Sequence, residues 1–281
     1  MFLTIYKATF KNLFRTVTFW LCLAVYFIVA FQNATSIHYG GYSQELKEVI
    51  VDTDPRFVLS YSNMCKEISN SARHLLQYIL PIFTTITAVI ILNRDYNDHF
   101  YEIEKAGGIK SYQYLFARVS ALISINYLIA VLSHFFAFHF YVYTRGGVNG
   151  MHFEEYLAKT TYQLMINNFF RLLPCVIFFV CFTYCIGTLF KSRIIAALCG
   201  MSYTIISMIV YRFTLLKAGL FLDYFTPNPG YLEKYLYGYH YDNIKVEGVT
   251  IEQAAMCLAL FFGLSLVFSL ISYLRIRKRT V

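Results

Sequence analysis

Six long apolar segments that contain no Asp, Glu, Lys or Arg constrain the fold of this chain more than any other feature of its sequence. Each segment approaches the ~20 residues that a helix needs to cross the hydrocarbon core of a bilayer. Helices are the expected form, because a helix satisfies its own backbone hydrogen bonds where no water can do so. The sequence therefore predicts an all-α membrane protein with six transmembrane helices, near residues 19–37, 75–92, 119–143, 172–190, 194–211 and 254–274.

The composition agrees with this prediction. The chain has 281 residues, of which 58% are hydrophobic and only 14% are charged, whereas soluble domains carry about 25% charged residues. We expect residues 1–281 to form a single transmembrane domain, since no stretch is left for a separate soluble domain of ~150 residues. The net charge is +8, but the bases lie in small groups beside the apolar segments, as the positive-inside bias predicts. Membrane lipids rather than nucleic acid are therefore their expected partners.

The distribution of charge predicts the orientation. With both termini inside the cell, the inner segments are residues 1–18, 93–118, 191–193 and 275–281, and they hold 13 basic and 4 acidic residues. The outer segments hold 11 basic and 12 acidic residues. Because basic residues accumulate on the cytoplasmic side, we expect a multi-pass protein of the cell (plasma) membrane with both termini in the cytoplasm. Four bases are expected to anchor the last segment at the membrane interface: Arg275, Arg277, Lys278 and Arg279.

Residues 1–18 have the pattern of an amphipathic helix. Lys7, Lys11 and Arg15 are four residues apart and so lie on one helical face. Aromatic and aliphatic side chains occupy most of the remainder. Such a helix fits the plane of the membrane interface better than a span, so we predict an elbow helix that these three bases anchor. A plain cytoplasmic extension of the first span is the alternative.

Residues 93–118 form a charged segment between two apolar ones. Four bases alternate with four acids, and Gly107-Gly108 lies in the middle. The segment is long enough for a helix, a glycine break and a second helix beneath the membrane. Glycine permits a turn with positive φ at such a break. A structured cytoplasmic turn with both signs of charge is suited to docking another protein; a solvated turn that only serves the positive-inside bias is the alternative.

Residues 212–253 form the third unusual segment, on the predicted outer side. An apolar run at 218–225 is too short to cross, and Thr226-Pro227-Asn228-Pro229-Gly230 follows it. Short helices broken by Pro and Gly can enter a bilayer only where protein covers their backbone. We predict an extracellular re-entrant or cap segment between the fifth and sixth transmembrane helices, with an ordinary folded loop as the alternative.

This pattern resembles the membrane (permease) subunit of a type-2 ABC transporter of the exporter class. Glu102-Ile103-Glu104-Lys105-Ala106-Gly107-Gly108 resembles the family's Glu-rich, Gly-containing entry to its coupling helix, and Lys110-Ser111 lies where its turn would be. In topology the resemblance covers the whole chain. It implies a coupling region at residues 93–118 that docks an ABC-type ATPase subunit, with these residues in contact: Glu102, Glu104, Lys105, Gly107, Gly108, Lys110 and Tyr112.

The resemblance also implies partner subunits, one of which would bind and hydrolyse ATP in place of this chain. ATP and Mg²⁺ would bind to the ATPase subunit, and a second permease copy or a related permease subunit would complete the pathway. The chain itself has no G-x-x-x-x-G-K-[ST] phosphate loop. We therefore expect no cofactor, no catalytic residue and no enzymatic activity in this chain. An apolar, aromatic pathway without buried charge suits a lipid, a hydrophobic peptide or an amphipathic drug.

Metal chemistry is not expected. The histidines show no H-E-x-x-H or paired spacing, and Cys181 and Cys185 have no nearby His or acid in the sequence. We interpret these two cysteines as small packing residues.

Two other classes of function remain open. The first is an integral-membrane enzyme or sensor scaffold that acts through its outer loops, but the outer acids are widely separated: Asp52, Asp54, Glu154, Glu155, Asp223 and Asp242. The second is a proton-coupled carrier, which commonly uses acids within the membrane. The absence of Asp and Glu from the six predicted spans counts against it.

The predicted topology has a direct test. A cysteine placed at position 104 should react with a membrane-impermeant reagent from the cytoplasmic side and not from outside intact cells, because residues 93–118 are predicted to lie inside. Labelling of position 104 from outside would overturn the topology.

Overall fold

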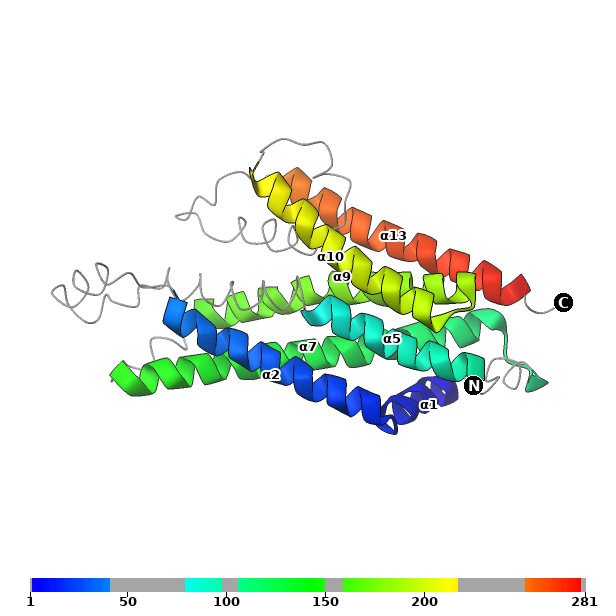
Figure 1. Cartoon of the computed structure of the whole chain (residues 1–281), viewed down its shortest axis with the longest axis horizontal. Coiled ribbons are helices and arrows are strands. Elements are labelled where there is room, and N and C mark those ends of the chain that lie inside the picture. The colour runs from blue at the N-terminus through cyan, green and yellow to red at the C-terminus, as the bar shows by residue number, and fades with distance from the viewer. Residues whose placement is uncertain (1, 41–78, 98–105, 150–158, 217–250, 279–281) are drawn as a thin grey trace.

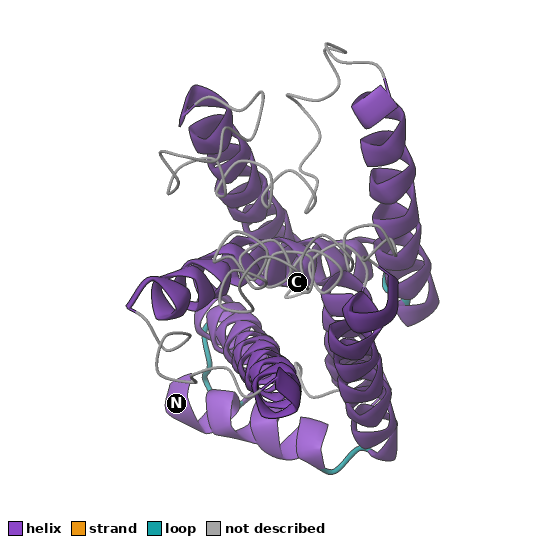
Figure 2. Cartoon of the chain, turned by 90° about the vertical axis from the view of Figure 1, so that its left-hand side faces the viewer, coloured by secondary structure: helices purple, strands orange, loops and turns teal. Residues whose placement is uncertain are grey.

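The computed structural model describes residues 2–40, 79–97, 106–149, 159–216 and 251–278. These residues form helices and no strand (Figure 1 and Figure 2), which confirms the all-α class for the part of the chain described. The seven helices are α1 (Phe2–Phe14), α2 (Val17–Gly40), α5 (Leu80–Asn97), α7 (Ser111–Asn149), α9 (Lys159–Phe190), α10 (Arg193–Leu216) and α13 (Ile251–Lys278).

Three helical stretches are long and apolar enough to cross a membrane, and they match the third, fourth and sixth predicted spans: Ser111–Phe136, Leu172–Phe190 and Leu258–Lys278. The pair α1 and α2 makes a fourth if it is counted as one bent span. Helices α5 and α10 stand at the second and fifth predicted positions, but their described residues do not reach the same length and hydropathy. Helix α5 ends in the polar run Asn93-Arg94-Asp95-Tyr96-Asn97, and the apolar part of α10, Arg193–Ile206, is short.

Helix α1 is bent by 73° from α2, as the prediction of an elbow helix requires. The break falls at Arg15 and Thr16, where the Thr16 hydroxyl donates to the Asn12 carbonyl at 2.9 Å. The Trp20 indole N–H donates to the Phe14 carbonyl at 2.7 Å, which satisfies an acceptor that the end of α1 leaves open. Side chain and backbone polar groups therefore hold the bend between the two helices.

Helix α9 is the centre of the bundle. It packs against α5, α7, α10 and α13. In its most apolar stretch of 18 residues, 72% is buried inside the bundle, whereas the corresponding stretch of α13 is 22% buried. Phenylalanines fill the contact: the Phe178 ring lies 5.3 Å from Phe261 on α13 and 5.3 Å from Tyr203 on α10, between ring centroids. The last helix is thus peripheral, and most of its apolar surface faces outward.

Several helices are longer than the apolar segments that predicted them. Helix α7 continues through Gly146-Gly147 to Asn149, and α9 begins at Lys159, so residues at both ends of the predicted outer segment 144–167 are helical. At 1.5 Å per residue, the 39 residues of α7 extend about 58 Å, well beyond a hydrocarbon core of about 30 Å. Hydropathy predicts which part of a helix lies in lipid, but it does not predict where the helix itself ends. The predicted re-entrant segment lies largely outside the described residues, at 217–250.

One end of the bundle gathers most of the features singled out in the sequence. The start of α1, the end of α5, the start of α7, the turn between α9 and α10 and the end of α13 all lie at this end (Figure 1). The first and last helices therefore begin and finish on the same side, which is the arrangement that the charge distribution predicts for the two termini.

Two glycines allow helices to approach α5 closely. A Cβ added at Gly200 on α10 would lie 2.5 Å from Thr85 Cγ2 and 3.2 Å from Thr85 Cβ. A Cβ added at Gly187 on α9 would lie 2.4 Å from a terminal methyl of Leu92. Leu92 can move that methyl, whereas Thr85 is short, β-branched and fully buried. Small residues at such contacts are typical of helix pairs in membranes.

Replacing Gly200 by Ala should lower the thermal unfolding midpoint of the detergent-purified protein. Over-packing a tight contact costs about 1–3 kcal/mol, which exceeds the ~1 kcal/mol that a helix gains when Gly becomes Ala. Gly263→Ala is the matched control, because nothing lies within 4 Å of a Cβ at that position of α13, and it should keep or raise the midpoint. Equal midpoints for the two variants would contradict the close approach of α10 to α5.

Candidate functional site

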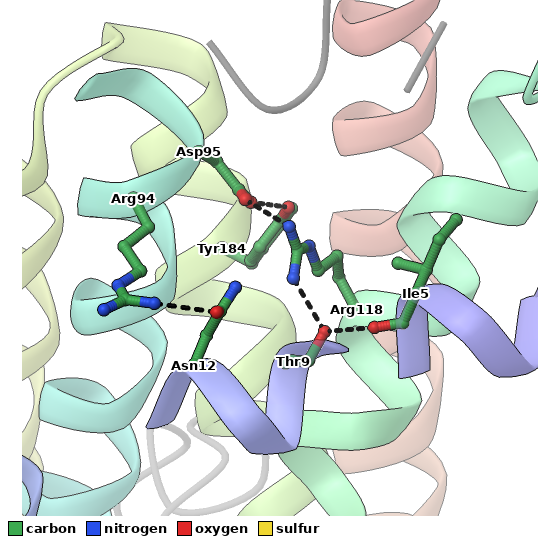
Figure 3. A network of polar contacts seen from close by, with 7 residues as sticks. All are labelled: Ile5, Thr9, Asn12, Arg94, Asp95, Arg118 and Tyr184. Carbon is green, nitrogen blue, oxygen red and sulfur yellow. Dashed lines mark hydrogen bonds and ion pairs between the residues drawn. The ribbon is translucent and has the colours of Figure 1, made fainter. Parts of the chain in front are cut away.

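A buried ion pair joins the end of α5 to the start of α7. An Asp95 carboxylate oxygen lies 2.8 Å from an Arg118 guanidinium nitrogen, and the two side chains are 6% and 0% exposed. Figure 3 shows the pair pointing toward each other between the helices. Both residues belong to the segment 93–118 that the sequence singled out, and they are the described charges of that segment that lie inside the bundle.

The local sequence explains why these two residues meet. Helix α5 continues as a helix beyond its apolar part to Asn97, and α7 begins at Ser111. The Lys110 carbonyl accepts from the backbone N–H groups of Gln113 and Tyr114 at 2.9 and 3.1 Å, which starts α7. Two successive helices joined at one end of the bundle bring the last turn of the first beside the first turns of the second (Figure 1).

The ion pair connects two further helices. The Tyr184 hydroxyl on α9 donates to the other carboxylate oxygen of Asp95 at 3.0 Å. On the opposite side, Arg118 donates to the Thr9 hydroxyl on α1 at 2.8 Å, and that hydroxyl donates to the Ile5 carbonyl at 2.9 Å. The result is a chain of polar contacts through α9, α5, α7 and α1 (Figure 3), which we call the four-helix polar network.

An aromatic ring covers the guanidinium of the network. The Tyr114 ring, one turn before Arg118 on α7, has its centroid 5.3 Å from the guanidinium carbon. Tyr114 is itself buried. A cation above an aromatic face is stabilised by the ring quadrupole, and more so where water is excluded. The charge of Arg118 is therefore enclosed by a carboxylate, a hydroxyl and an aromatic face.

Two contacts beside the network bind the end of α5 to its neighbours. The half-buried Arg94 donates to the Asn12 side-chain carbonyl on α1 at 2.7 Å (Figure 3). The Tyr96 hydroxyl donates to the Gly187 carbonyl on α9 at 2.7 Å. Since Arg94, Asp95 and Tyr96 are consecutive, the last turn of α5 contacts α1, α7 and α9 through three adjacent side chains.

The stability of the buried ion pair depends on the hydrogen bonds around it. Burying two charges costs several kcal/mol each, and their attraction offsets this only with good geometry and further hydrogen bonds. The network supplies those bonds from Tyr184 and Thr9. Losing one partner would leave the other charge buried and uncompensated, so the free energy of unfolding depends strongly on keeping both.

The predicted docking residues divide into two groups. Glu102, Glu104 and Lys105 lie outside the described residues. Gly107, Gly108, Lys110 and Tyr112 lie at the exposed entry to α7, and the Gly108 φ of 82° confirms the positive-φ turn predicted at the glycine pair.

The predicted interface anchors are exposed where they are described. This holds for Lys7, Lys11, Arg15, Arg275, Arg277 and Lys278, while Arg279 lies outside the described residues. The bases of α1 and those of α13 stand at the same end of the bundle (Figure 1).

Sequence reasoning missed the burial of Asp95 and Arg118. The hydropathy pattern places both among the charges of the inner turn and begins the third span at residue 119. The structure corrects this: the candidate span Ser111–Phe136 contains Arg118. Asp95 lies three residues after one predicted span and Arg118 directly before the next. In a helical hairpin these two positions lie at similar depth. This spacing was the sequence signal that could have predicted the contact between Asp95 and Arg118. Nothing in the sequence pointed to Thr9 or Tyr184.

A metal site has no support within the described part of the chain. No group of three or more His, Cys, Asp or Glu side chains that could hold a metal ion occurs there. Cys181 and Cys185 are buried free thiols, and the Ser269 hydroxyl on α13 donates to the Cys181 sulfur at 3.3 Å. Their position between α9 and α13 agrees with the interpretation as packing residues.

Comparison of the chain with models of known protein families finds no match, and comparison with curated proteins finds none either.

The ion pair predicts a characteristic double-mutant result. Asp95→Asn alone and Arg118→Met alone should each lower the free energy of unfolding by about 3–5 kcal/mol, because each leaves one buried charge without its partner. The double variant should lose less than the sum by ~0.5–3 kcal/mol, since it is neutral and the amide introduced at position 95 can still accept from Tyr184. Denaturant unfolding in a defined detergent measures all three values.

Arg94→Met is the matched control for this cycle. It removes an arginine one position away that is half-buried and bonded to a neutral amide, so its effect should be smaller and should add to that of Asp95→Asn. Full additivity between Asp95→Asn and Arg118→Met would contradict the pairing.

Proposed function

We propose that this chain is the membrane (permease) subunit of an ATP-driven exporter of the type-2 ABC class. It crosses the cell membrane six times, with α5 and α10 as the second and fifth spans and both termini in the cytoplasm. An ABC-type ATPase subunit, which binds ATP and Mg²⁺, docks on residues 93–118. A second permease copy or a related subunit completes a pathway for a lipid, a hydrophobic peptide or an amphipathic drug, and residues 212–253 form a re-entrant cap outside.

The observation that carries this proposal is the four-helix polar network at the two ends of the docking segment. Residues 98–110 join α5 to α7, and Asp95 and Arg118 tie those two helices to each other, to α1 and to α9. A force that reaches Asp95 or Arg118 would therefore pass to four helices through short polar contacts. A coupling region needs this property, because nucleotide-driven movement of the partner must change the arrangement of the spans.

Two further features support the proposal. The 73° bend between α1 and α2 suits an interfacial elbow that leads into the first span. Next, Lys110 and Tyr112 are exposed beside the Gly108 turn, so the entry to α7 is accessible to a docking partner.

A proton-coupled carrier is the second candidate, and the burial of Asp95 is the observation that favours it. Membrane carriers commonly move protons on such acids. However, Arg118 and Tyr184 both contact the Asp95 carboxylate, and its side chain is only 6% exposed. A carboxylate that is paired and enclosed in this way favours the structural coupling role.

The proposal predicts an ATPase partner with a phosphate loop. The tagged chain, purified from the membranes of the cells in which it naturally occurs, should co-purify with such a subunit, identified by mass spectrometry. The complex should hydrolyse ATP, and the isolated chain should not. Hydrolysis at transporter-like rates by the isolated chain, or transport driven by a proton gradient without ATP, would contradict the proposal.

Reversing charges in the docking segment should weaken that association. A contact that involves a charged group contributes ~1.5–3 kcal/mol, so Glu104→Lys combined with Lys105→Glu should reduce recovery of the ATPase by about one to two decades in affinity. An exposed pair contributes only ~0.2–1 kcal/mol. Lys191→Glu is the control, because Lys191 is exposed in the other turn at the same end. Equal recovery by correctly inserted, monodisperse variants would mean that the segment is only a solvated turn.

A further inference from the structure

The surface of α1 is divided into three lengthwise strips. One strip is buried against the bundle, chiefly α7, and consists of Ile5, Thr9 and Leu13. Beside it runs a ladder of four aromatic residues, each four positions after the last: Phe2, Tyr6, Phe10 and Phe14. Beyond the ladder runs a third strip, the exposed bases Lys7 and Lys11, which the exposed Arg15 continues at the break after α1. The helix thus presents an aromatic and a basic surface side by side.

The aromatic ladder is continuous and leads into α2. Successive ring centroids from Phe2 to Phe14 are 6.0, 5.1 and 6.4 Å apart, and the Phe14 ring lies 5.7 Å from the Trp20 ring. Phe14 is 44% exposed and Trp20 is 50% exposed. Phe2 at the start of the ladder is also exposed, whereas Tyr6 and Phe10 are half-buried, so the ladder offers most apolar surface at its two ends and around the bend.

The basic strip has no acidic partner among the side chains that the structure describes. The one described carboxylate is that of Asp95, and it is buried against Arg118. The charged side chain of α5 that contacts α1 is another base, Arg94, which donates to Asn12. Positive charge thus lies along one side of α1.

The bend gives these strips an orientation. Because α1 turns by 73° from α2, a membrane-spanning α2 places α1 along the bilayer surface. The aromatic ladder then meets the boundary of the acyl chains, and the bases beside it reach the level of the phosphate groups. Polybasic segments at this level attract anionic lipids.

We propose that the aromatic ladder and basic strip of α1 form a binding surface for anionic phospholipids of the bilayer. The bases contact the phosphate headgroups, and the rings contact the upper acyl chains. This inference requires that the chain is embedded in a membrane, but it does not depend on ATP-driven export. A zwitterionic lipid offers the same acyl chains without net charge, so the basic strip distinguishes the two classes.

Trp20 makes the proposal testable by fluorescence. It is the single tryptophan of the chain, and it lies at the end of the ladder. The full chain is reconstituted into vesicles of phosphatidylcholine with a minor fraction of phosphatidylglycerol. Either the first or the second lipid carries bromine on its acyl chains, and bromine quenches tryptophan only at short range. One base near the surface attracts an anionic lipid by ~1 kcal/mol, which corresponds to about five-fold enrichment of that lipid beside the protein. Brominated phosphatidylglycerol should therefore quench Trp20 as strongly as a lipid present at about five times its actual mole fraction.

Two sets of substitutions distinguish a specific lipid-binding surface on α1 from attraction of anionic lipid by the overall positive charge of the protein. Lys7→Gln, Lys11→Gln and Arg15→Gln together should abolish the enrichment, as should 1 M salt, where the Debye length is about 3 Å. Lys191→Gln and Arg193→Gln together remove two exposed bases at the turn between α9 and α10, at the same end of the bundle, and should preserve it, because neither residue belongs to the predicted interface anchors.

Other outcomes would overturn the proposal. Quenching in proportion to mole fraction in the wild-type protein would show no preference for anionic lipid. Equal loss in the α1 variant and in the Lys191/Arg193 control would show that only the overall positive charge matters. Millimolar inorganic phosphate that removed the enrichment would indicate a site for a soluble anion rather than a lipid. Circular dichroism of each variant verifies that α1 and the remaining helices are intact.

Discussion

The energy of one desolvated ion pair sets the arrangement of helices at the charged end of this protein. Asp95 and Arg118 are almost fully enclosed, so each charge depends on the other and on the groups around them. Tyr184, Thr9 and the Tyr114 ring supply those groups from three helices. A shift of any of these helices would weaken contacts whose loss is costly in a water-poor environment. The relative positions of α1, α5, α7 and α9 are therefore linked through a few atoms.

Packing across the rest of the bundle depends on the fit of apolar side chains and on separate buried polar pairs, such as Thr87 on α5 with Asn126 on α7. Aromatic side chains fill the contacts of α9 with α10 and α13, and the glycines at 187 and 200 admit neighbouring side chains. In lipid there is little hydrophobic drive between apolar helices, so close fit and polar contacts determine which surfaces meet. The polar network specifies one end of the bundle, while steric fit and separate polar pairs specify its middle.

The sequence predicted the helical class and the approximate positions of the helices, because hydropathy and periodicity are local properties. It did not reveal where helices extend beyond the lipid, as α7 does through Gly146-Gly147, since polar residues form helices equally well outside the membrane. It also placed Asp95 and Arg118 in water. Whether a charge at the end of a span is solvated or buried depends on residues such as Thr9 and Tyr184, which come from distant segments and carry no signal in the local pattern.

The members of the four-helix polar network are synthesised at different times. Thr9, Asp95 and Arg118 emerge before Tyr184, which follows Arg118 by 66 residues in the chain. At ~5–20 residues per second this interval lasts roughly 3–13 s. During it, the carboxylate can pair with the guanidinium, but its second oxygen must be hydrated or find a temporary donor. The arrival of α9 then replaces that donor with the Tyr184 hydroxyl. Helices α1, α2, α5 and α7 are thus made before the Tyr184 hydroxyl, and the second Asp95 oxygen gains its native donor only when α9 packs against them.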